Sequence, residues 1–284
     1  MWRRLVRQAI SLIALVLVGG FLGAGLVRVA PGFDVDDREL DPRLSPASLE
    51  WLRAARAADG NLATFYWAYL KGLTQGEMGV SRSLRRPVTE LLRERGPMTL
   101  RLVAFGLVAG WTLGLGLAVF AAVSRMPGAW LASAGVSSLF LALPAALAGL
   151  LVLYLDAPRW WAVAFVILPK VFSYARPLIE RVYAAPHVLL ARAKGLGEVR
   201  MFCWHVLPAM APELFALAGV SVSLACGVTI PLEAVCDIPG AGQLAWQAAA
   251  GRDLPVLVSL TLLFALVARV ANAAADLATE AVRP

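Results

Sequence analysis

Residues 103–123 read VAFGLVAGWTLGLGLAVFAAV and contain no charged side chain. An α-helix of about 20 apolar residues crosses the roughly 30 Å hydrocarbon core of a bilayer, so this stretch predicts a transmembrane helix. The short stretch at 160–174 spans a bilayer only if its helix includes Ala157 and Pro158 or continues past Tyr174. Together with four other apolar stretches it completes six predicted spans: Ile10–Val29, Val103–Val123, Leu131–Leu155, Trp160–Tyr174, Leu214–Ile230 and Val256–Ala275.

The composition of the 284-residue chain supports an all-α polytopic membrane protein. Hydrophobic residues make up 60% of the sequence and charged residues 16%, which is more apolar and less charged than a soluble domain. No span alternates apolar and polar residues along its length, which disfavours a membrane β-barrel. The net charge of +7 is also a feature of nucleic-acid-binding proteins, so the positions of the cations must decide its meaning.

The Lys and Arg residues are divided unevenly between the two sides of the predicted spans. Cytoplasmic loops of membrane proteins carry an excess of these cations. With the N-terminus inside, the short outside loops hold only Arg159 and Arg252, whereas the inside segments hold Arg3, Arg4, Arg7, Arg125, Lys170, Arg176, Arg181, Arg192, Lys194, Arg200 and Arg283. The cations therefore orient the helices. Both termini are predicted to be cytoplasmic, and no nucleic-acid partner is predicted.

The predicted spans divide the chain into an inside N-terminus (1–9), a first transmembrane helix (10–29), an outside segment (30–101) and a core domain (102–284). The outside segment holds 11 Lys and Arg beside 10 Asp and Glu, and a loop of this length translocates largely regardless of charge. A helix is predicted in it from Pro87 to near Gly96-Pro97. Arginines before the first apolar run are also typical of a signal peptide, but the length of that run favours a retained helix.

Side chains that carry catalysis or bind metals are scarce. The two histidines, His187 and His205, do not join Cys or carboxylate residues at metal-ligand spacing, and Cys203 with His205 supplies only two of the three or four ligands that zinc needs. Neither the phosphate-binding pattern GxxxxGKS/T nor the nucleophile pattern GxSxG occurs. No metal site is predicted, and a chain that acts alone as an enzyme is disfavoured.

Gly106, Gly110 and Gly114 follow one another at four-residue spacing in the second span. Small residues at this spacing share one helix face and let a neighbouring helix approach closely within a bilayer. Glycine is also frequent in membrane helices generally, which leaves that alternative open. The three glycines are a candidate helix-packing face.

The inside loop at 175–213 is long beside the other inside loops. Its pattern predicts a helix at Val188–Lys194, a break at Gly195 and Gly197, and an amphipathic helix at Val199–Leu207 that stops at Pro208. Two short helices with a glycine turn between them suit docking onto a soluble partner.

Several motifs of this sequence, in order along almost the whole chain, resemble the B-type inner-membrane permeases of ABC importers of the dipeptide, oligopeptide and nickel branch. The stretches Ala191–Leu196 and His205–Pro208 resemble the "EAA" loop of that family. The other matching pieces are Pro31-Gly32, Gly76–Ser81, Pro87-Val88, Pro97–Leu100, Glu233, Pro239–Gly242, Arg252–Val256, and the pair Asn272 and Asp276.

Two features depart from the family pattern. Leu189 stands where the family has the glutamate of its EAA loop, and His187 stands where the family has an aromatic residue. The outside connection at Asp156–Arg159 is shorter than in relatives. A salt bridge from the EAA glutamate is therefore not carried over, and a specialised or degenerate member is allowed.

The resemblance implies a six-helix permease of the type I ABC-importer kind in the bacterial inner membrane, with a periplasmic segment after the first helix. The implied partners are a second permease subunit, two ABC ATPase subunits and an extracytoplasmic solute-binding protein. This chain would be non-catalytic and hold no cofactor, because ATP and Mg²⁺ would bind the ATPases. The implied cargo is peptide first and a nickel chelate second. The alternative is an autonomous channel or secondary transporter, which predicts paired intramembrane charges or inverted repeats.

The resemblance also implies roles for particular residues. Arg192 and Lys194 are expected to meet acidic groups of the ATPase, with the alternative that they only orient the helices as inside cations. Gly195 is expected to form a sharp turn. Glu233 and Asp237 are expected to contact the binding protein or the substrate, beyond a helix broken at Pro231. The expected ATPase-coupling residues are Ala191, Arg192, Ala193, Lys194, Gly195, His205 and Pro208.

Overall fold

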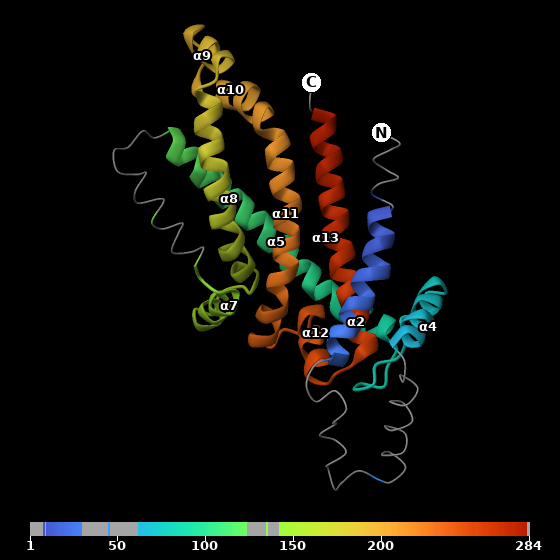
Figure 1. Cartoon of the computed structure of the whole chain (residues 1–284). Helices are drawn as coiled ribbons and strands as arrows, with labels where there is room; N and C mark the ends of the chain where they lie inside the picture. The colour runs from blue at the N-terminus through green and yellow to red at the C-terminus, as the bar shows by residue number, and fades with distance from the viewer. Residues whose placement is uncertain are drawn as a thin grey trace. The chain divides into compact units, whose positions relative to one another are not determined.

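The computed structural model describes residues 8, 10–29, 45, 62–123, 135 and 142–282. These residues are helical apart from turns and one isolated bridge between Val80 and Pro87. In Figure 1 the first described helices are coloured blue and the last, α13, is coloured red. The helices are η1 (Leu15–Gly19), α2 (Gly20–Val29), α4 (Leu62–Thr74), α5 (Val88–Val123), α7 (Ala145–Tyr154), α8 (Trp160–Tyr183), α9 (Pro186–Ala193), α10 (Glu198–Met201), η3 (Phe202–Val206), α11 (Leu207–Val235), α12 (Ala241–Ala250) and α13 (Leu254–Val282).

Four helices in the described part of the chain are long and apolar enough to cross a membrane: Val88–Val123, Trp160–Tyr183, Glu198–Val235 and Leu254–Val282. Each contains one of the predicted spans. Ile10–Gly25 and Ala145–Tyr154 are shorter apolar helices. The predicted third span, at 131–155, falls largely outside the described residues, and α7 covers its C-terminal part. The helical, strand-free fold is as predicted over the described residues, with four full-length spans and two shorter helices.

Three helix ends differ from the sequence-based predictions, and each involves proline. The helix at 88 does not end near Gly96-Pro97, because α5 continues through Pro97 to Val123. The helix after Gly197 does not stop at Pro208, which lies in the first turn of α11, where a missing N–H costs little. The π-helical turn η3 precedes it, and Leu207 N–H bonds to Phe202 O, five residues back. Likewise α11 is not broken at Pro231 and ends at Val235.

The predicted inside loop at 175–213 is mostly helical. Helix α8 continues past Tyr174 to Tyr183, which supplies the extra length that the short fourth span required. Helix α11 begins at Leu207. The connection between α8 and α11 is therefore residues 184–206, here named the coupling segment. In Figure 1 its α9 and α10 lie at one end of the α8 and α11 pair.

Contacts divide the chain into two compact units, residues 1–96 with 244–266, and residues 97–243 with 267–284. In the second unit, α5 packs on α8 through the three spaced glycines. A Cβ atom at Gly106 would lie 2.5 Å from Val163 Cβ, one at Gly110 would lie 2.9 Å from Ile167 Cβ, and one at Gly114 would lie 2.8 Å from Leu168 O. Only a residue without a side chain permits this approach of two helices.

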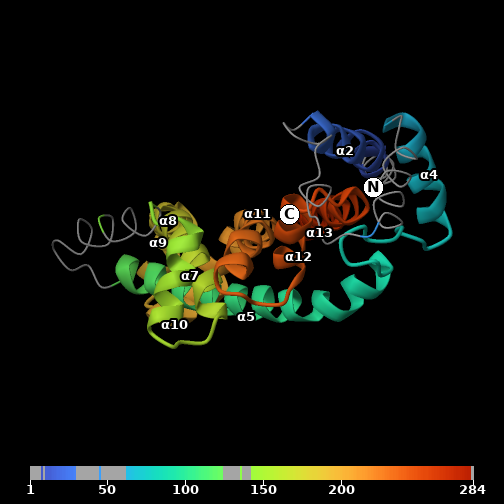
Figure 2. The ribbon, with the colours of Figure 1, turned by 90° about the horizontal axis from the view of Figure 1, so that it is seen from below.

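In the first unit, α4 lies beside α2 (Figure 2). The contact is aromatic: Tyr66 is buried, meets Phe21 edge to face at 6.0 Å, and donates a hydrogen bond to Val16 O. Tyr69 lies 2.9 Å from Ser259 Oγ, and that hydroxyl donates to Pro255 O at 2.7 Å. Tyr69 is therefore the donor of the pair. Burial raises the pKa of Tyr69, so the phenol keeps its proton at physiological pH.

Candidate functional site

A buried carboxylate, Glu233, joins three segments of the second unit. Its Oε1 accepts a hydrogen bond from Thr99 Oγ1 at 2.7 Å. Its Oε2 accepts the backbone N–H groups of Gly242 at 2.7 Å and Gln243 at 3.1 Å. Thr99 Oγ1 in turn accepts the N–H of Ala241 at 2.7 Å. Three free N–H groups in the first turn of α12 are thus satisfied by two side chains from other helices.

The loop before α12 fits closely around this carboxylate. A Cβ atom at Gly240 would lie 2.2 Å from Glu233 Oε2, and one at Gly242 would lie 2.6 Å from Thr229 O. Both positions therefore require glycine. The positive end of the α12 dipole and the buried anion stabilise each other. The sequence pieces Pro97–Leu100, Glu233 and Pro239–Gly242 are thereby brought together at one hydrogen-bonded centre.

This geometry differs from the role expected for Glu233. Its side chain is 0% exposed, so in this conformation it cannot touch a substrate or a binding protein. Asp237 is exposed, has a φ of 49°, and accepts a hydrogen bond from Gln243 Nε2 at 2.6 Å. Of the two expected contact residues, only Asp237 has an accessible carboxylate.

A second buried carboxylate, Asp253, lies in the first unit. Its Oδ2 accepts hydrogen bonds from Ser81 Oγ at 2.6 Å, Ser83 Oγ at 2.8 Å and Ser83 N at 3.0 Å. Asp253 precedes α13, and its own carbonyl accepts the N–H of Leu257 at 2.9 Å. Its Oδ1 is buried and has no hydrogen-bond partner among the described residues. The sequence pieces Gly76–Ser81 and Arg252–Val256 therefore meet at this carboxylate.

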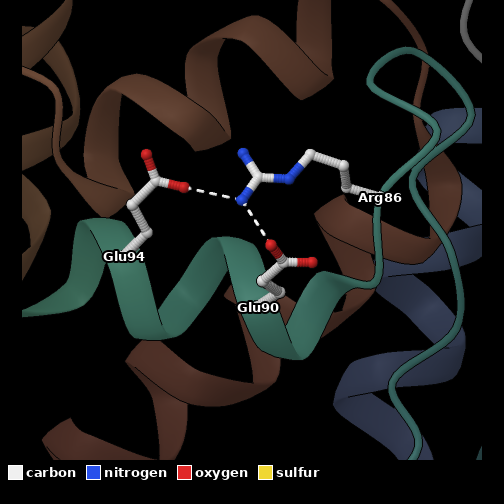
Figure 3. Close-up of polar contacts among 3 residues, drawn as sticks. All are labelled: Arg86, Glu90 and Glu94. Carbon is white, nitrogen blue, oxygen red and sulfur yellow. Dashed lines mark hydrogen bonds and ion pairs between the residues drawn. The ribbon is translucent and has the colours of Figure 1, made fainter.

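The loop that carries Ser81 leads into α5 through an exposed ion-pair network. Arg86 Nη2 lies 2.7 Å from Glu90 Oε1 and 2.9 Å from Glu94 Oε2. Figure 3 shows the guanidinium between the two carboxylates on successive turns of α5. The hydrogen bonds that Arg86 donates to Glu90 and Glu94 raise the pKa of Arg86. The network lies at the start of α5, and exposed pairs of this kind contribute little to stability.

In the coupling segment, α9 is amphipathic. Val188 and Ala191 are buried, and Val188 packs in a cluster with Ile179 of α8 and Met210 of α11. Leu189, where the family has a glutamate, is 49% exposed. An apolar side chain therefore takes the outward position of that charge.

A Schellman turn ends α9. Gly195 has a φ of 77°, its N–H bonds to Arg192 O at 2.9 Å, and Leu196 N–H bonds to Ala191 O at 3.4 Å. This is the common glycine-dependent C-cap of a helix. The sharp turn expected at Gly195 is present.

The two cations expected to meet an ATPase differ in their surroundings. Lys194 is exposed. Arg192 Nη2 lies 3.6 Å from Glu198 Oε1, and its Cζ lies 5.7 Å from the ring centroid of Tyr183. Arg192 thus contacts its own chain. His205 has a buried Nδ1 without a hydrogen-bond partner in the described part of the chain.

Asn272 of α13 connects to α11. Its Nδ2 donates to Ser223 Oγ at 2.9 Å, and a Cβ atom at Gly219 would lie 2.9 Å from Asn272 Oδ1. Asp276 is exposed. Among the described residues no group of three or more His, Cys, Asp or Glu side chains is arranged to hold a metal ion.

Comparisons with known proteins agree with these features. The family described as "binding-protein-dependent transport system inner membrane component" matches residues 97–284. A protein of Brucella ovis named as a peptide permease is 29% identical over 295 residues, covering 91% of both chains. The dipeptide transport system permease protein DppB of Lactococcus lactis is 26% identical, covering 99% of both. The glutathione transport system permease protein GsiC of Salmonella paratyphi A is 26% identical, covering 98% of this chain and 97% of its own.

The fold has a counterpart among solved structures. A chain of the MetNI methionine ABC transporter, in an inward-facing conformation, aligns with a TM-score of 0.59 and 19% identity, covering 69% of this chain and 98% of its own. Because the family match spans residues 97–284, it takes in the coupling segment, the Glu233 centre and the helices around them. The chain therefore belongs to the family of binding-protein-dependent transport system inner membrane components, the membrane permeases of ABC transporters.

Proposed function

We propose that this permease forms half of a translocation pathway for small peptides, beside a second permease subunit, in an importer driven by two cytoplasmic ATPases. The named substrates of its relatives are peptide, dipeptide and glutathione, and all of them contain peptide bonds. A chelated nickel ion is the second candidate cargo. An extracytoplasmic binding protein would deliver the cargo, and ATP and Mg²⁺ would bind the ATPases, so this chain would catalyse no reaction of its own.

The observation that carries the proposal is the way α9 is anchored. Val188, on its buried face, packs in one cluster with residues of both α8 and α11. A packed interior transmits displacement because it contains few voids. A force that moves α9 would therefore move the ends of two spans together. ATPase closure on ATP would act through the segment Ala191–Pro208 to switch the spans between inward-open and outward-open arrangements.

The outward face of α9 supports contact with a soluble partner. Leu189 and Leu190 are 49% and 59% exposed, and Lys194 is exposed at the end of the helix. We propose that Lys194 faces acidic groups of the ATPase. In this proposal the coupling segment and both chain termini lie in the cytoplasm and residues 30–101 lie in the periplasm, which is the orientation that the distribution of cations predicts.

Purification of the native complex, followed by mass spectrometry of its subunits and bound ligand, tests the proposal. We expect a second permease, an ATPase with a phosphate-binding loop, and a peptide. Isolation of this chain only as a lone homodimer, after mild solubilisation and at several detergent concentrations, would instead support a channel or secondary transporter that needs no ATPase.

A further inference from the structure

We infer that Arg192 is a positioning residue of the coupling segment, which ties α9 to α8 and α10 within this chain and does not reach the ATPase. The inference rests on the proposed function, since coupling has meaning only if an ATPase moves α9. It assigns the two neighbouring cations of the segment to different partners. Arg192 is assigned to contacts within this chain, and Lys194 is assigned to the ATPase.

The contacts of Arg192 lead to three helices. It lies in the last turn of α9. Its Cζ stands 5.7 Å from the ring centroid of Tyr183, the last residue of α8, within the distance at which a cation and an aromatic face attract. Its Nη2 is within ion-pair distance, 3.6 Å, of Glu198, the first residue of α10. The Nε atom is buried, so the base of the guanidinium is not turned toward solvent.

The turn between α9 and α10 explains why such a tie is useful. It contains two glycines, Gly195 and Gly197, and a Cβ at either position would meet nothing within 4 Å. Glycine is the most flexible residue of the backbone, and no side chain packs at these positions to stiffen the turn. Arg192 and Glu198 stand on opposite sides of this turn. Their pairing makes α9, the turn and α10 respond to a force as one piece, and the Tyr183 contact passes it to α8.

A charge swap tests the pairing in the full-length chain within its complex. The variants are Arg192→Glu, Glu198→Arg and the double variant, and Lys194→Glu serves as the comparison for assembly with the ATPase. Uptake per ATP hydrolysed is measured in proteoliposomes, with the di- or tripeptide that the wild-type complex transports best. Each single variant at 192 or 198 is expected to lower this ratio about fivefold, the lower end of ordinary coupling between sites. The double variant is expected to recover to within about twofold of wild type.

The amount of ATPase in the purified complex distinguishes the Arg192–Glu198 pairing from a direct contact between Arg192 and the ATPase. Complexes with Arg192→Glu are expected to retain their ATPase subunits at the wild-type ratio, because the side chain acts within the chain. Lys194→Glu is expected to lose ATPase on purification and not to be rescued by Glu198→Arg. A swap variant that couples as poorly as Arg192→Glu, or loss of ATPase from Arg192→Glu, would overturn the inference.

Tyr183 supplies a conservative test. The guanidinium lies over the ring of Tyr183, so Tyr183→Phe is expected to keep the coupling ratio. Tyr183→Leu is expected to lower it by no more than about twofold, the loss left in the double variant, which also lacks a cation over this ring. Equal loss in both variants would mean that the hydroxyl matters and the ring contact does not.

Tryptic cleavage in the turn between α9 and α10 tests the pairing without a transport measurement. Trypsin cleaves after Lys194, which lies in the turn, and mass spectrometry can quantify that product alone. When cleavage follows local opening, its rate reports the population of the open turn. Arg192→Glu and Glu198→Arg are expected to raise this rate about fivefold, and the double variant to return it toward wild type. If the wild-type complex transports no peptide, but the double variant is as resistant to trypsin as wild type, then the proposed function is wrong and the Arg192–Glu198 pairing is supported. If transport is normal but the swap restores nothing, only the pairing fails.

Discussion

Thr99 donates a hydrogen bond from Oγ1 to Glu233 Oε1 at 2.7 Å, although the two residues are 134 positions apart in the sequence. The same hydroxyl oxygen accepts the N–H of Ala241 at 2.7 Å. One side chain therefore connects α5, α11 and the start of α12. Loss of one partner from a buried hydrogen-bonded group costs about 1–3 kcal/mol, so this small group is a sensitive point of the fold.

Replacing Thr99 by valine keeps the shape of the side chain and removes the hydroxyl. We expect a loss of about 1–3 kcal/mol in stability, seen as a lower melting temperature of the purified complex. Thr99→Ser is expected to restore most of the loss. Thr112→Val is the matched control in the same helix, because the Thr112 hydroxyl bonds only to carbonyls of its own helix turn and is exposed. A Thr112 variant as unstable as the Thr99 variant would contradict this account of the Glu233 centre.

Large side chains on α5 are expected to disrupt folding at the glycines that face α8 and to be tolerated elsewhere on the helix. Leucine at Gly110 would overlap Ile167 of α8, because even a Cβ atom there lies 2.9 Å from Ile167 Cβ. Gly116 lies in the same helix with nothing within 4 Å of its Cβ position. We therefore expect Gly110→Leu to reduce the amount of folded protein in the membrane strongly, and Gly116→Leu to leave it near wild type. Size-exclusion chromatography after mild solubilisation measures both, and equal behaviour would remove the assignment of this face to α8.

Substitution of the buried Asp253 is expected to lower stability by an amount that depends on which hydrogen-bond acceptor atoms the new side chain keeps. Asp253→Asn replaces one carboxylate oxygen by an NH₂ group, which cannot accept hydrogen bonds from Ser81 and Ser83. If that group faces the serines, the loss is about 1–3 kcal/mol, and if it faces the side of Oδ1 the bonds survive in weaker, uncharged form. Asp253→Ala removes both oxygens and should cost at least as much. Thermal unfolding of the two variants checks the order, and an Asp253→Ala protein as stable as wild type would exclude a structural role for this carboxylate.

A side chain at position 195 is expected to strain the backbone without clashing with neighbouring atoms. A Cβ atom at this position meets nothing within 4 Å, yet the φ of 77° costs a residue with a side chain about 1 kcal/mol or more. Gly195→Ala is expected to lower ATP-driven uptake while leaving insertion in the membrane intact. Asparagine tolerates this conformation better than alanine, so uptake by Gly195→Asn should fall between that of wild type and that of Gly195→Ala. Gly197→Ala, at an extended backbone position with a φ of −64°, is the control that should transport normally.

Much of the fold follows from local composition. An uncharged apolar run of sufficient length has few alternatives to a membrane helix, and four predicted spans lie within observed helices. The errors concern helix ends. The sequence pattern predicts helix boundaries at Pro97, Pro208 and Pro231, whereas the structure has Pro208 in a first helical turn and the other two inside continuing helices. A local pattern does not reveal whether neighbouring helices compensate for a missing N–H group.

The partners of the buried carboxylates could not be read from sequence periodicity. Ser81 and Asp253 are separated by 172 positions, and no local rule pairs them. The order of family-like motifs was the only signal that these pieces belong together. It identified Glu233 but suggested an exposed role, because a carboxylate beside a predicted helix break reads as accessible. The in-chain contacts of Arg192 were missed for a similar reason, since an arginine in a loop reads as a free cation until Tyr183 and Glu198 are placed around it.

We propose that this permease moves small peptides only when ATPases act on its coupling segment. The most direct measurement is uptake of radiolabelled di- and tripeptides into proteoliposomes that contain the purified complex, with its binding protein on the substrate side and ATP on the ATPase side. Accumulation that requires ATP hydrolysis and the binding protein, and that falls in Gly195→Ala while the complex stays assembled, is the predicted result. Equal uptake by the permease chain without ATPases or ATP would contradict the claim.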